Sequence, residues 1–361
     1  MIYRDYAGKK TAALGFGAMR FESPHDIDKS AATVLRAHEK GLTYFDTAPG
    51  YCDDQSEIIV GEAVKEMKKS RRPFTVSSKS SRSDGDRVRE QLETSLKRLN
   101  VDTIDYYNCW YVLTKKDWEG RKKGGAVKAI LQAKEEGLIR HAAFSTHLPG
   151  PQIREVIEEG YFEGVTLGYS VINFPFRQEG IQAAAERNMG VVVMNPLGGG
   201  LIPANPDAFG FLKAHPDQSI LEAALHFLLS DPRITVSLVG FRNDEDVDSA
   251  AAAVDSFQPY TPETIETIRG KVEQEFNAMC TSCMYCNVCP EDIPVWTYME
   301  TWNHIKLSGG EDAADRLKYH WGTSIDELER CTSCGKCVRA CTQRLPILER
   351  FEEVKAAVAG T

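Results

Sequence analysis

The chain has 361 residues, 42% of them hydrophobic, and a formal net charge of −9. This length allows a large core and more than one domain. The acidic balance argues against nucleic acid as a main partner, because phosphate binding requires a basic face. The N-terminus is charged at once and no apolar run is as long as a membrane span, so we expect a cytoplasmic protein with no membrane partner.

Strand-like and helix-like segments alternate along most of the chain, after a β-hairpin predicted at residues 1–12. Strands are expected at 12–19, 43–46, 74–78, 104–109, 139–145, 165–169, 191–194 and 236–240. Helices are expected at 28–40, 56–69, 84–99, 125–136, 152–159, 180–188, 219–229 and 244–254, with Ser56 as the N-cap of the second. Eight strand–helix pairs in about 245 residues are typical of a (β/α)8 TIM barrel. A doubly wound sheet normally needs fewer pairs.

Eight of the ten cysteines lie in two runs near the C-terminus. Each run has three cysteines at two-residue gaps and a fourth further on. This spacing is typical of two [4Fe–4S] clusters, in which the fourth cysteine of each run binds the other cluster. It predicts one cluster on Cys280, Cys283, Cys286 and Cys341, and another on Cys331, Cys334, Cys337 and Cys289. Two zinc knuckles would leave half of the thiols unused, and disulfides belong to oxidising compartments.

The cysteine runs also predict how the chain divides. We expect a barrel over 1–257, a helical connector over 258–275, and a small helical, ferredoxin-like 4Fe-4S domain over 276–361. Pro290 follows the first run as in ferredoxins, whereas Thr342 stands where a second proline would be. Because oxygen degrades exposed clusters, the composition favours an anaerobe or a reducing cytosol.

Polar residues stand at the ends of neighbouring predicted strands, where a TIM barrel has its active site. The second strand ends at Asp46 and leads to Tyr51, the third ends at Lys79, and the fourth ends at Trp110. The fifth ends in Ser145-Thr146-His147. Singly, these are ordinary surface or core residues, but together they form a candidate site. Cys52 and Cys109 lie beside the candidates, although a lone cysteine is usually a small hydrophobe.

The chain resembles the aldo/keto reductases, and its cysteine tail resembles the ferredoxin-tailed branch of that family. The resemblance rests on residues 44–51, 56–57, 61–63, 79, 95–99, 105, 137–141, 173 and 196–200. It implies NADP(H)-linked reduction of a carbonyl on a small substrate, or the reverse oxidation of an alcohol. Tyr51 would donate the proton, with Lys79 lowering its pKa and Asp46 holding Lys79. Trp110 replaces the family's catalytic histidine; an indole can orient or stack but cannot move a proton.

The same resemblance implies a set of nucleotide contacts, with Arg242 near the 2′-phosphate. The set is Ser145, Asn173, Pro196, Leu197, Gly198, Gly200, Gly240 and Arg242. At five other positions where the family has nucleotide-binding residues, this chain has Thr146, Tyr169, Met194, Ser249 and Ala250. An alternative function is therefore an enzyme without nicotinamide, in which a ferredoxin or another electron-transfer protein feeds single electrons into the barrel site. A third possible function is that of a non-catalytic electron-transfer protein, which the presence of Asp46, Tyr51 and Lys79 disfavours.

Overall fold

The computed structural model describes residues 1–276 and 278–359. The chain forms two compact units: Met1–Leu197 with Leu212–Arg269, and Gly198–Phe211 with Gly270–Thr361. Among the described residues, no helix is both long enough and apolar enough to span a bilayer.

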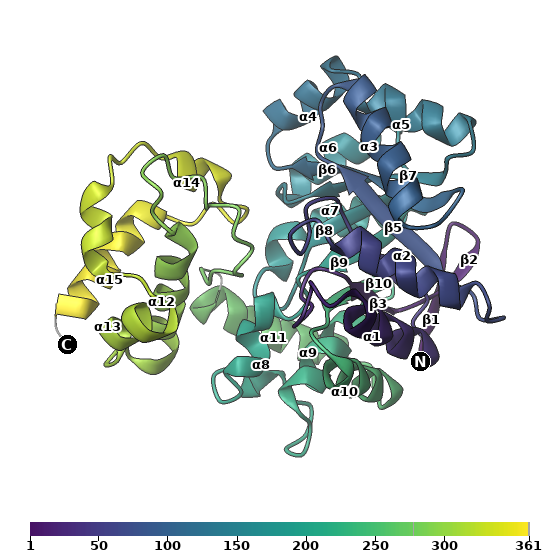
Figure 1. The fold of residues 1–361 in the computed structure, drawn as a ribbon. Helices are drawn as coiled ribbons and strands as arrows, with labels where there is room; N and C mark the ends of the chain where they lie inside the picture. The colour runs from purple at the N-terminus through teal and green to yellow at the C-terminus, as the bar shows by residue number, and fades with distance from the viewer. Residues whose placement is uncertain (277, 360–361) are drawn as a thin grey trace. The chain divides into compact units, whose positions relative to one another are not determined.

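The first unit contains a closed barrel of eight parallel strands surrounded by helices (Figure 1), which confirms the predicted (β/α)8 fold. In barrel order the strands are β10 (Val236–Gly240), β3 (Leu14–Gly17), β4 (Tyr44–Asp46), β5 (Thr75–Ser80), β6 (Ile104–Val112), β7 (Ile139–Thr146), β8 (Gly164–Gly168) and β9 (Gly190–Met194). The helices are α1 (Ile27–Glu39), α2 (Ser56–Met67), α3 (Gly85–Arg98), α4 (Lys115–Lys123), α5 (Ala126–Glu135), α6 (Gly150–Glu158), α7 (Phe174–Glu186), α9 (Ile220–Leu229) and α10 (Asp244–Asp255). Helix α11 (Pro262–Glu275) follows.

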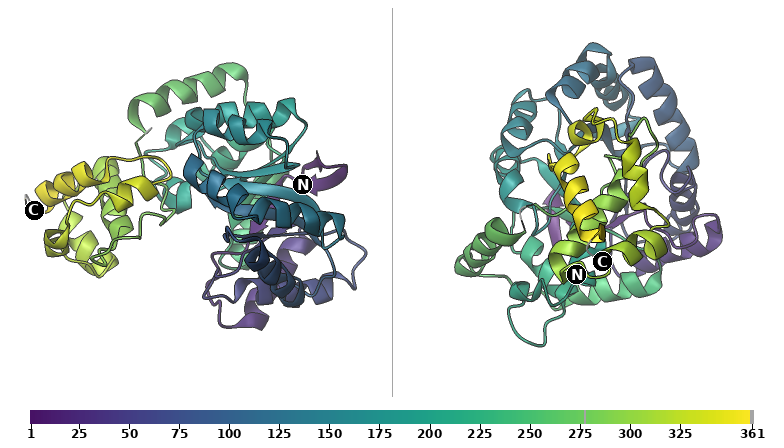
Figure 2. Two further views of the ribbon diagram at one scale, coloured as in Figure 1. Left: turned by 90° about the horizontal axis from the view of Figure 1, so that it is seen from above. Right: turned by 90° about the vertical axis from the view of Figure 1, so that its left-hand side faces the viewer.

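The predicted N-terminal hairpin, β1 (Tyr3–Tyr6) with β2 (Lys9–Ala12), closes one end of the barrel (Figure 2). Tyr6 is buried and stacks on Tyr106 with the ring centroids 4.0 Å apart. A Cβ on Gly164 would lie 2.0 Å from the Tyr6 hydroxyl, and one on Gly190 would lie 1.9 Å from its ring. These glycines begin β8 and β9, so Tyr6 fills the N-terminal end of the barrel. The opposite end, where the strands finish, is left for the site.

Three local predictions need correction. Ser56 is the first residue of α2 and Gln55 is the N-cap; the Ser56 hydroxyl instead lies 2.6 Å from Thr47 Oγ1 and donates to the Ala18 carbonyl. Helix α7 begins at Phe174 rather than at 180, and α4 was not predicted. The sequence of α4 is almost entirely polar, so it has no apolar periodicity, and its start is fixed by a capping box at Thr114.

The second unit is mainly helical, as predicted. Its helices are α8 (Leu201–Ala204), α12 (Val295–Ser308), α13 (Ala313–Asp315), α14 (Lys336–Ala340) and α15 (Ile347–Ala359), with α12 packed against α15 (Figure 1). Gly198–Phe211 also belongs to this unit, whereas the domain boundaries expected at 257 and 275 stay predictions. Phe209 and Phe211 lie against Phe276, with ring centroids 5.0 and 5.2 Å apart. This aromatic contact joins the segment to residues that follow much later.

Candidate active site and cluster-binding segment

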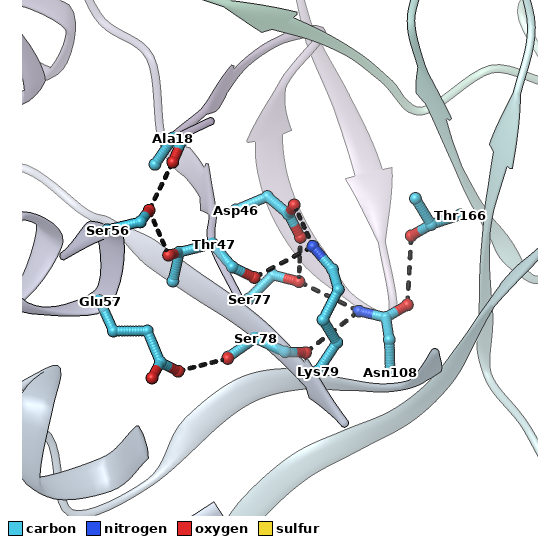
Figure 3. Close-up of polar contacts among 10 residues, drawn as sticks. All are labelled: Ala18, Asp46, Thr47, Ser56, Glu57, Ser77, Ser78, Lys79, Asn108 and Thr166. Atoms are coloured by element: carbon cyan, nitrogen blue, oxygen red, sulfur yellow. Dashed lines mark hydrogen bonds and ion pairs between the residues drawn. The ribbon is translucent and has the colours of Figure 1, made fainter. Parts of the chain in front are cut away.

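An ion pair at the C-terminal ends of β4 and β5 forms the centre of the candidate site (Figure 3). Lys79 Nζ lies 2.5 Å from Asp46 Oδ2 and 3.0 Å from the Thr47 carbonyl oxygen. Both side chains of the pair are less than 5% exposed. Buried charges of opposite sign that also have further hydrogen bonds hold each other in one position. The pair therefore fixes the Lys79 ammonium at the end of the barrel.

A chain of hydrogen bonds continues from Asp46 across the barrel interior (Figure 3). Ser77 Oγ donates to Asp46 Oδ1 at 2.8 Å, and Asn108 Nδ2 donates to Ser77 Oγ at 3.1 Å. Thr166 Oγ1 donates to Asn108 Oδ1 at 3.2 Å. This hydrogen-bond chain was not predicted from the sequence, although polar residues in strands that are otherwise apolar are a usable signal. Its effect is to fix the second oxygen of the Asp46 carboxylate.

Two aromatic rings flank the ammonium. Lys79 Nζ lies 5.0 Å from the ring centroid of Tyr51 and 5.9 Å from that of Trp110. The two rings are perpendicular, with their centroids 5.5 Å apart. Trp110 lies where the pairing of β6 with β7 shifts register between Cys109 and Val112, and such irregularities re-aim side chains. The structure thus brings all four predicted catalytic residues together.

The pKa of Tyr51 is raised, whereas the sequence predicted that it is lowered. Burial is the largest cause, the Asp46 carboxylate adds to it, and the Arg20 guanidinium opposes it. Lys79 cannot act as a lone cation on the phenol, because Asp46 neutralises its charge at 2.5 Å. Tyr51 is therefore a neutral phenol that can donate a proton. Arg20, which follows β3, is a neighbouring cation that the sequence analysis did not single out.

The loop that carries Tyr51 has an unusual backbone. Gly50, Cys52, Asp53 and Asp54 all have positive φ, at 82°, 53°, 53° and 66°. A left-handed conformation costs roughly 1–2 kcal/mol for each residue other than glycine. The Asp54 carboxylate offsets this cost by accepting hydrogen bonds from the Gly50 amide at 2.9 Å and from two Arg98 nitrogens at 2.8 and 2.7 Å. Arg98 on α3 therefore holds the loop from outside the site.

The residues expected to bind a nucleotide are only partly available. Asn173 Oδ1 accepts a hydrogen bond from the Ser170 amide at 2.8 Å. Arg242 is exposed, but two of its nitrogens each lie 2.8 Å from an oxygen of Asp246. Helix α10 also begins with three consecutive acidic residues. The guanidinium fork that would meet a 2′-phosphate therefore already has a carboxylate partner in acidic surroundings.

The other expected nucleotide contacts are described by their positions alone. Ser145 is buried at the end of β7, Pro196 and Leu197 follow β9, and Gly240 ends β10. Gly198–Gly200 has positive φ at all three residues and belongs to the second unit. His147 is buried, and burial lowers its pKa well below the usual value, so its imidazole is neutral. The contacts of Ser145, Pro196, Leu197, Gly198, Gly200 and Gly240 with a nucleotide stay predictions.

All ten cysteines are described and none forms a disulfide. In the tail, burial raises the pKa of the Cys286 thiol, and the charges of Cys283 and Cys341 raise it further. Burial likewise raises the pKa of Cys337, and Cys289 contributes to that rise. Cys337 of the second run also acts on Cys286, so thiols of both runs affect one another.

Each of the two expected ligand sets, called here the first cysteine group (Cys280, Cys283, Cys286 and Cys341) and the second cysteine group (Cys331, Cys334, Cys337 and Cys289), offers four thiols. Four thiols are the donor set of a [4Fe–4S] cluster. Among the described residues, no three His, Cys, Asp or Glu side chains converge closely enough to hold a single metal ion. A cube does not require such convergence, because each thiolate binds a different iron. The groups differ in accessibility, since Cys280 and Cys286 are buried whereas Cys334 is exposed. The donor chemistry of the tail thus fits two clusters.

Comparison with known proteins gives a family for each part. Residues 13–273 match the aldo/keto reductase family and residues 279–345 match a 4Fe-4S dicluster domain. An NADH-specific methylglyoxal reductase of Escherichia coli K12 is 29% identical over 199 residues, 49% of this chain and 60% of that protein. Aflatoxin B1 aldehyde reductase member 2 of Rattus norvegicus is 40% identical over 96 residues, 25% of this chain and 26% of that protein. The chain therefore spans less than two thirds of the length of these relatives.

The fold has relatives among solved structures. An aldo-keto reductase from Bacillus halodurans in its holo form matches with a TM-score of 0.65 and 23% identity, covering 75% of this chain and 96% of that one. At this identity the match bears on the fold alone. The family match, by contrast, covers more than half of the chain. This chain belongs to the aldo/keto reductase family, and is an oxidoreductase of that family with a C-terminal 4Fe-4S dicluster domain.

Proposed function

We propose that the barrel site reduces the carbonyl group of a small substrate, with Tyr51 as the proton donor. The observation that carries the proposal is the buried Asp46–Lys79 pair with the Tyr51 and Trp110 rings beside it. A bound nicotinamide nucleotide would supply the hydride, and with it both electrons, to the carbonyl carbon. The Tyr51 hydroxyl gives its proton to the carbonyl oxygen, so that the product is an alcohol.

Each residue of the site has a distinct role in this proposal. Tyr51 stays neutral until the carbonyl oxygen gains negative charge. The Arg20 guanidinium, which favours the ionised phenol, then stabilises the phenolate that is left, while Lys79 holds the Tyr51 ring in place from 5.0 Å. Asp46 positions Lys79. Trp110 provides an apolar wall for the substrate and no second proton donor of histidine type. Two relatives whose names specify methylglyoxal and an aflatoxin aldehyde support a carbonyl substrate.

Replacing Tyr51 tests this role directly. Removing a positioned acid typically lowers the rate by about 10²–10⁴-fold, so Tyr51→Phe should lose that much kcat with KM for the carbonyl substrate little changed. Tyr161→Phe is the control, since Tyr161 is an exposed tyrosine of the same unit. Near-full activity in Tyr51→Phe would exclude Tyr51 as the donor.

The expected nucleotide, NADP(H), depends on Arg242. A guanidinium matches a 2′-phosphate well, but here Asp246 already accepts both of its hydrogen bonds. We therefore propose that the chain binds NADH and NADPH with similar affinity, and that Asp246→Asn shifts the preference towards NADPH by freeing Arg242. Fluorescence titration of both nucleotides with the wild type and this variant measures the preference. An unchanged ratio in Asp246→Asn would remove Arg242 from 2′-phosphate binding.

For the tail we propose two [4Fe–4S] clusters with the crossed ligand sets given above; when bound, they supply one-electron transfer. Cys283 Sγ lies 3.3 Å from Oγ1 of Thr342, the residue that follows Cys341, and this contact supports the crossed ligation. Anaerobic analysis should find about eight iron and eight sulfide per chain. Cys289→Ala should damage the cluster of the second run, and damage to the other cluster would reverse the assignment.

A second candidate function is reduction of the clusters by an acidic electron-transfer protein such as a ferredoxin, without nicotinamide. Cys334 is exposed, and the only charged residues from 330 to 344 are the exposed cations Arg330, Lys336, Arg339 and Arg344. Such a basic segment is notable in a chain of net charge −9, and it would attract an acidic donor at low ionic strength. Failure to bind either nucleotide, with fast and salt-sensitive cluster reduction by an acidic ferredoxin, would favour this candidate.

A further inference from the structure

A buried arginine lies in the second unit beside the thiols of the first cysteine group. Arg350, in the first turn of α15, is 1% exposed. Its guanidinium carbon lies 3.7 Å from the ring centroid of Trp302 on α12. One nitrogen, Nη2, donates to the Ala278 carbonyl oxygen, two residues before Cys280. The side chain is thus held in a fixed place at the start of the cysteine segment.

The remaining nitrogens of this guanidinium have no hydrogen-bond partner among the described residues. Nε and Nη1 are buried and make no hydrogen bond to any of the residues 1–276 and 278–359. A buried cation without a hydrogen-bonded counterion is unfavourable, even after relaxation of the surroundings. Burial accordingly lowers the pKa of Arg350, and the largest opposing effects come from Cys280 and Cys341. The protein groups that favour the Arg350 charge most are therefore two expected ligands of the same cluster.

A four-thiolate [4Fe–4S] site provides the missing negative charge. Such a site carries two negative charges when oxidised and three when reduced, because each thiolate adds one negative charge to the cube. Net charge and hydrogen bonds to sulfur are among the factors that set cluster potentials. Two further donors lie in the same group: Thr342 Oγ1 is 3.3 Å from Cys283 Sγ, and the Leu345 amide donates to Cys341 Sγ at 3.3 Å.

We propose that Arg350 is the built-in counterion of the cluster bound by Cys280, Cys283, Cys286 and Cys341, and that it makes this cluster easier to reduce than the other. The reduced state gains one negative charge, so a fixed cation stabilises it more than the oxidised state. In this buried place Coulomb interactions are screened far less than those of surface lysines and arginines. This inference rests on the proposed ligation of two clusters.

Other charges near this group do not replace Arg350. Glu300 is a buried carboxylate on α12 of the same unit. A nearby carboxylate disfavours further negative charge, which leaves Arg350 as the cation that opposes it. Beside the second group the cations are exposed: Arg339 Nη1 donates to the Cys334 carbonyl oxygen at 3.2 Å, and Lys336 faces solvent. Their effect on a cluster is weakened by water and salt.

The test is a redox titration of the anaerobically purified holoprotein, followed by electron paramagnetic resonance, with iron and sulfide measured on each sample. Arg350→Gln removes the charge with similar length, and Arg350→Lys keeps a cation. In Arg350→Gln the midpoint potential of the cluster bound by the Cys280 set should fall by at least about 59 mV, which is tenfold in the one-electron reduction equilibrium. The midpoint potential of the other cluster should not change. Lys355→Gln, a charge removal at a half-buried position of the same helix, is the control and should shift neither.

The iron content and the potentials of the two Arg350 variants show whether the charge or the shape of Arg350 matters to the cluster. If Arg350→Gln loses about half of the iron while Arg350→Lys keeps it all, the counterion role is supported, because the charge is then needed to hold the cluster. Unchanged potentials in a fully loaded Arg350→Gln would overturn the inference. Equal loss of iron in both variants would also overturn it, since shape rather than charge would then matter. Wild-type protein without about eight iron per chain would instead refute the proposed clusters themselves.

Discussion

The buried ion pair of the barrel gives the most quantitative prediction. Lys79 and Asp46 are less than 5% exposed and 2.5 Å apart, and the other hydrogen bond of Lys79 goes to the Thr47 carbonyl oxygen. Removing one partner of such a pair leaves an uncompensated buried charge and typically costs about 3–5 kcal/mol. Asp46→Asn and Lys79→Met should each lower the free energy of unfolding of the first unit by about that amount.

The double variant distinguishes pairing from simple loss of packing. With both charges gone no unpaired ion is left, so Asp46→Asn/Lys79→Met should be at least about 2 kcal/mol more stable than the sum of the single effects predicts. For a domain of this size 1 kcal/mol corresponds to about 2–4 °C, so each single variant should melt about 6–20 °C lower than the wild type. All three variants should lose carbonyl reduction, because Lys79 is lost or misplaced in each.

The measurement must separate the two units, because a two-unit chain need not unfold in one step. Circular dichroism recorded anaerobically during heating would report the helices of both units, and visible absorbance of the clusters would report the second unit alone, so the difference between the two signals gives the first unit. Additive effects within about 0.5 kcal/mol would refute the coupling. Single effects below about 1 kcal/mol would show that the pair behaves like an exposed salt bridge.

Three other predictions concern the surroundings of Tyr51. Trp110→Phe should reduce kcat less than Tyr51→Phe, and Trp110→His should raise carbonyl reduction by adding a polarising donor; steady-state kinetics compares them. Burial raises the pKa of Tyr51, so the phenol stays protonated up to at least its ordinary pKa of about 10. We therefore expect kcat to show no fall from Tyr51 ionisation between pH 6 and 10. The folding stability that the neutral phenol contributes is lost only above that range. Arg98→Met should release the left-handed loop and lower kcat about tenfold, the lower end of a positioning effect, with nucleotide affinity unchanged by titration.

The fold was predictable because its signals are local and repeated. Eight alternating segments with glycine or charged stops identify a barrel even when individual ends are wrong, as at Phe174. Asp46, Lys79 and Trp110 were found because they stand at strand ends. The helix Lys115–Lys123 was missed because it lacks an apolar stripe, and its capping box at Thr114 is the one local signal of its start.

The electrostatics of the site could not be read from the sequence. Whether a lysine lowers the pKa of a tyrosine depends on what neutralises the lysine, and Asp46 does so here. The Arg242–Asp246 pair has an i,i+4 spacing that was visible in the sequence, but its competition with a phosphate becomes plain only from the two 2.8 Å contacts. Arg350 gave no sequence signal at all, because a single arginine in an amphipathic helix looks like a solvated one.

The aromatic contact between Phe209, Phe211 and Phe276 also has a consequence for synthesis on the ribosome. The chain makes Gly198–Phe211 before α9, β10 and α11, so these two rings emerge well ahead of the residue that covers them. Strand β10 must emerge before it can pair with β3 and close the barrel. A nascent chain ending after Arg269 therefore holds strands β1 to β10 and still lacks Phe276. During that interval Phe209 and Phe211 lack the ring of Phe276, and synthesis of the cysteine-rich unit supplies it.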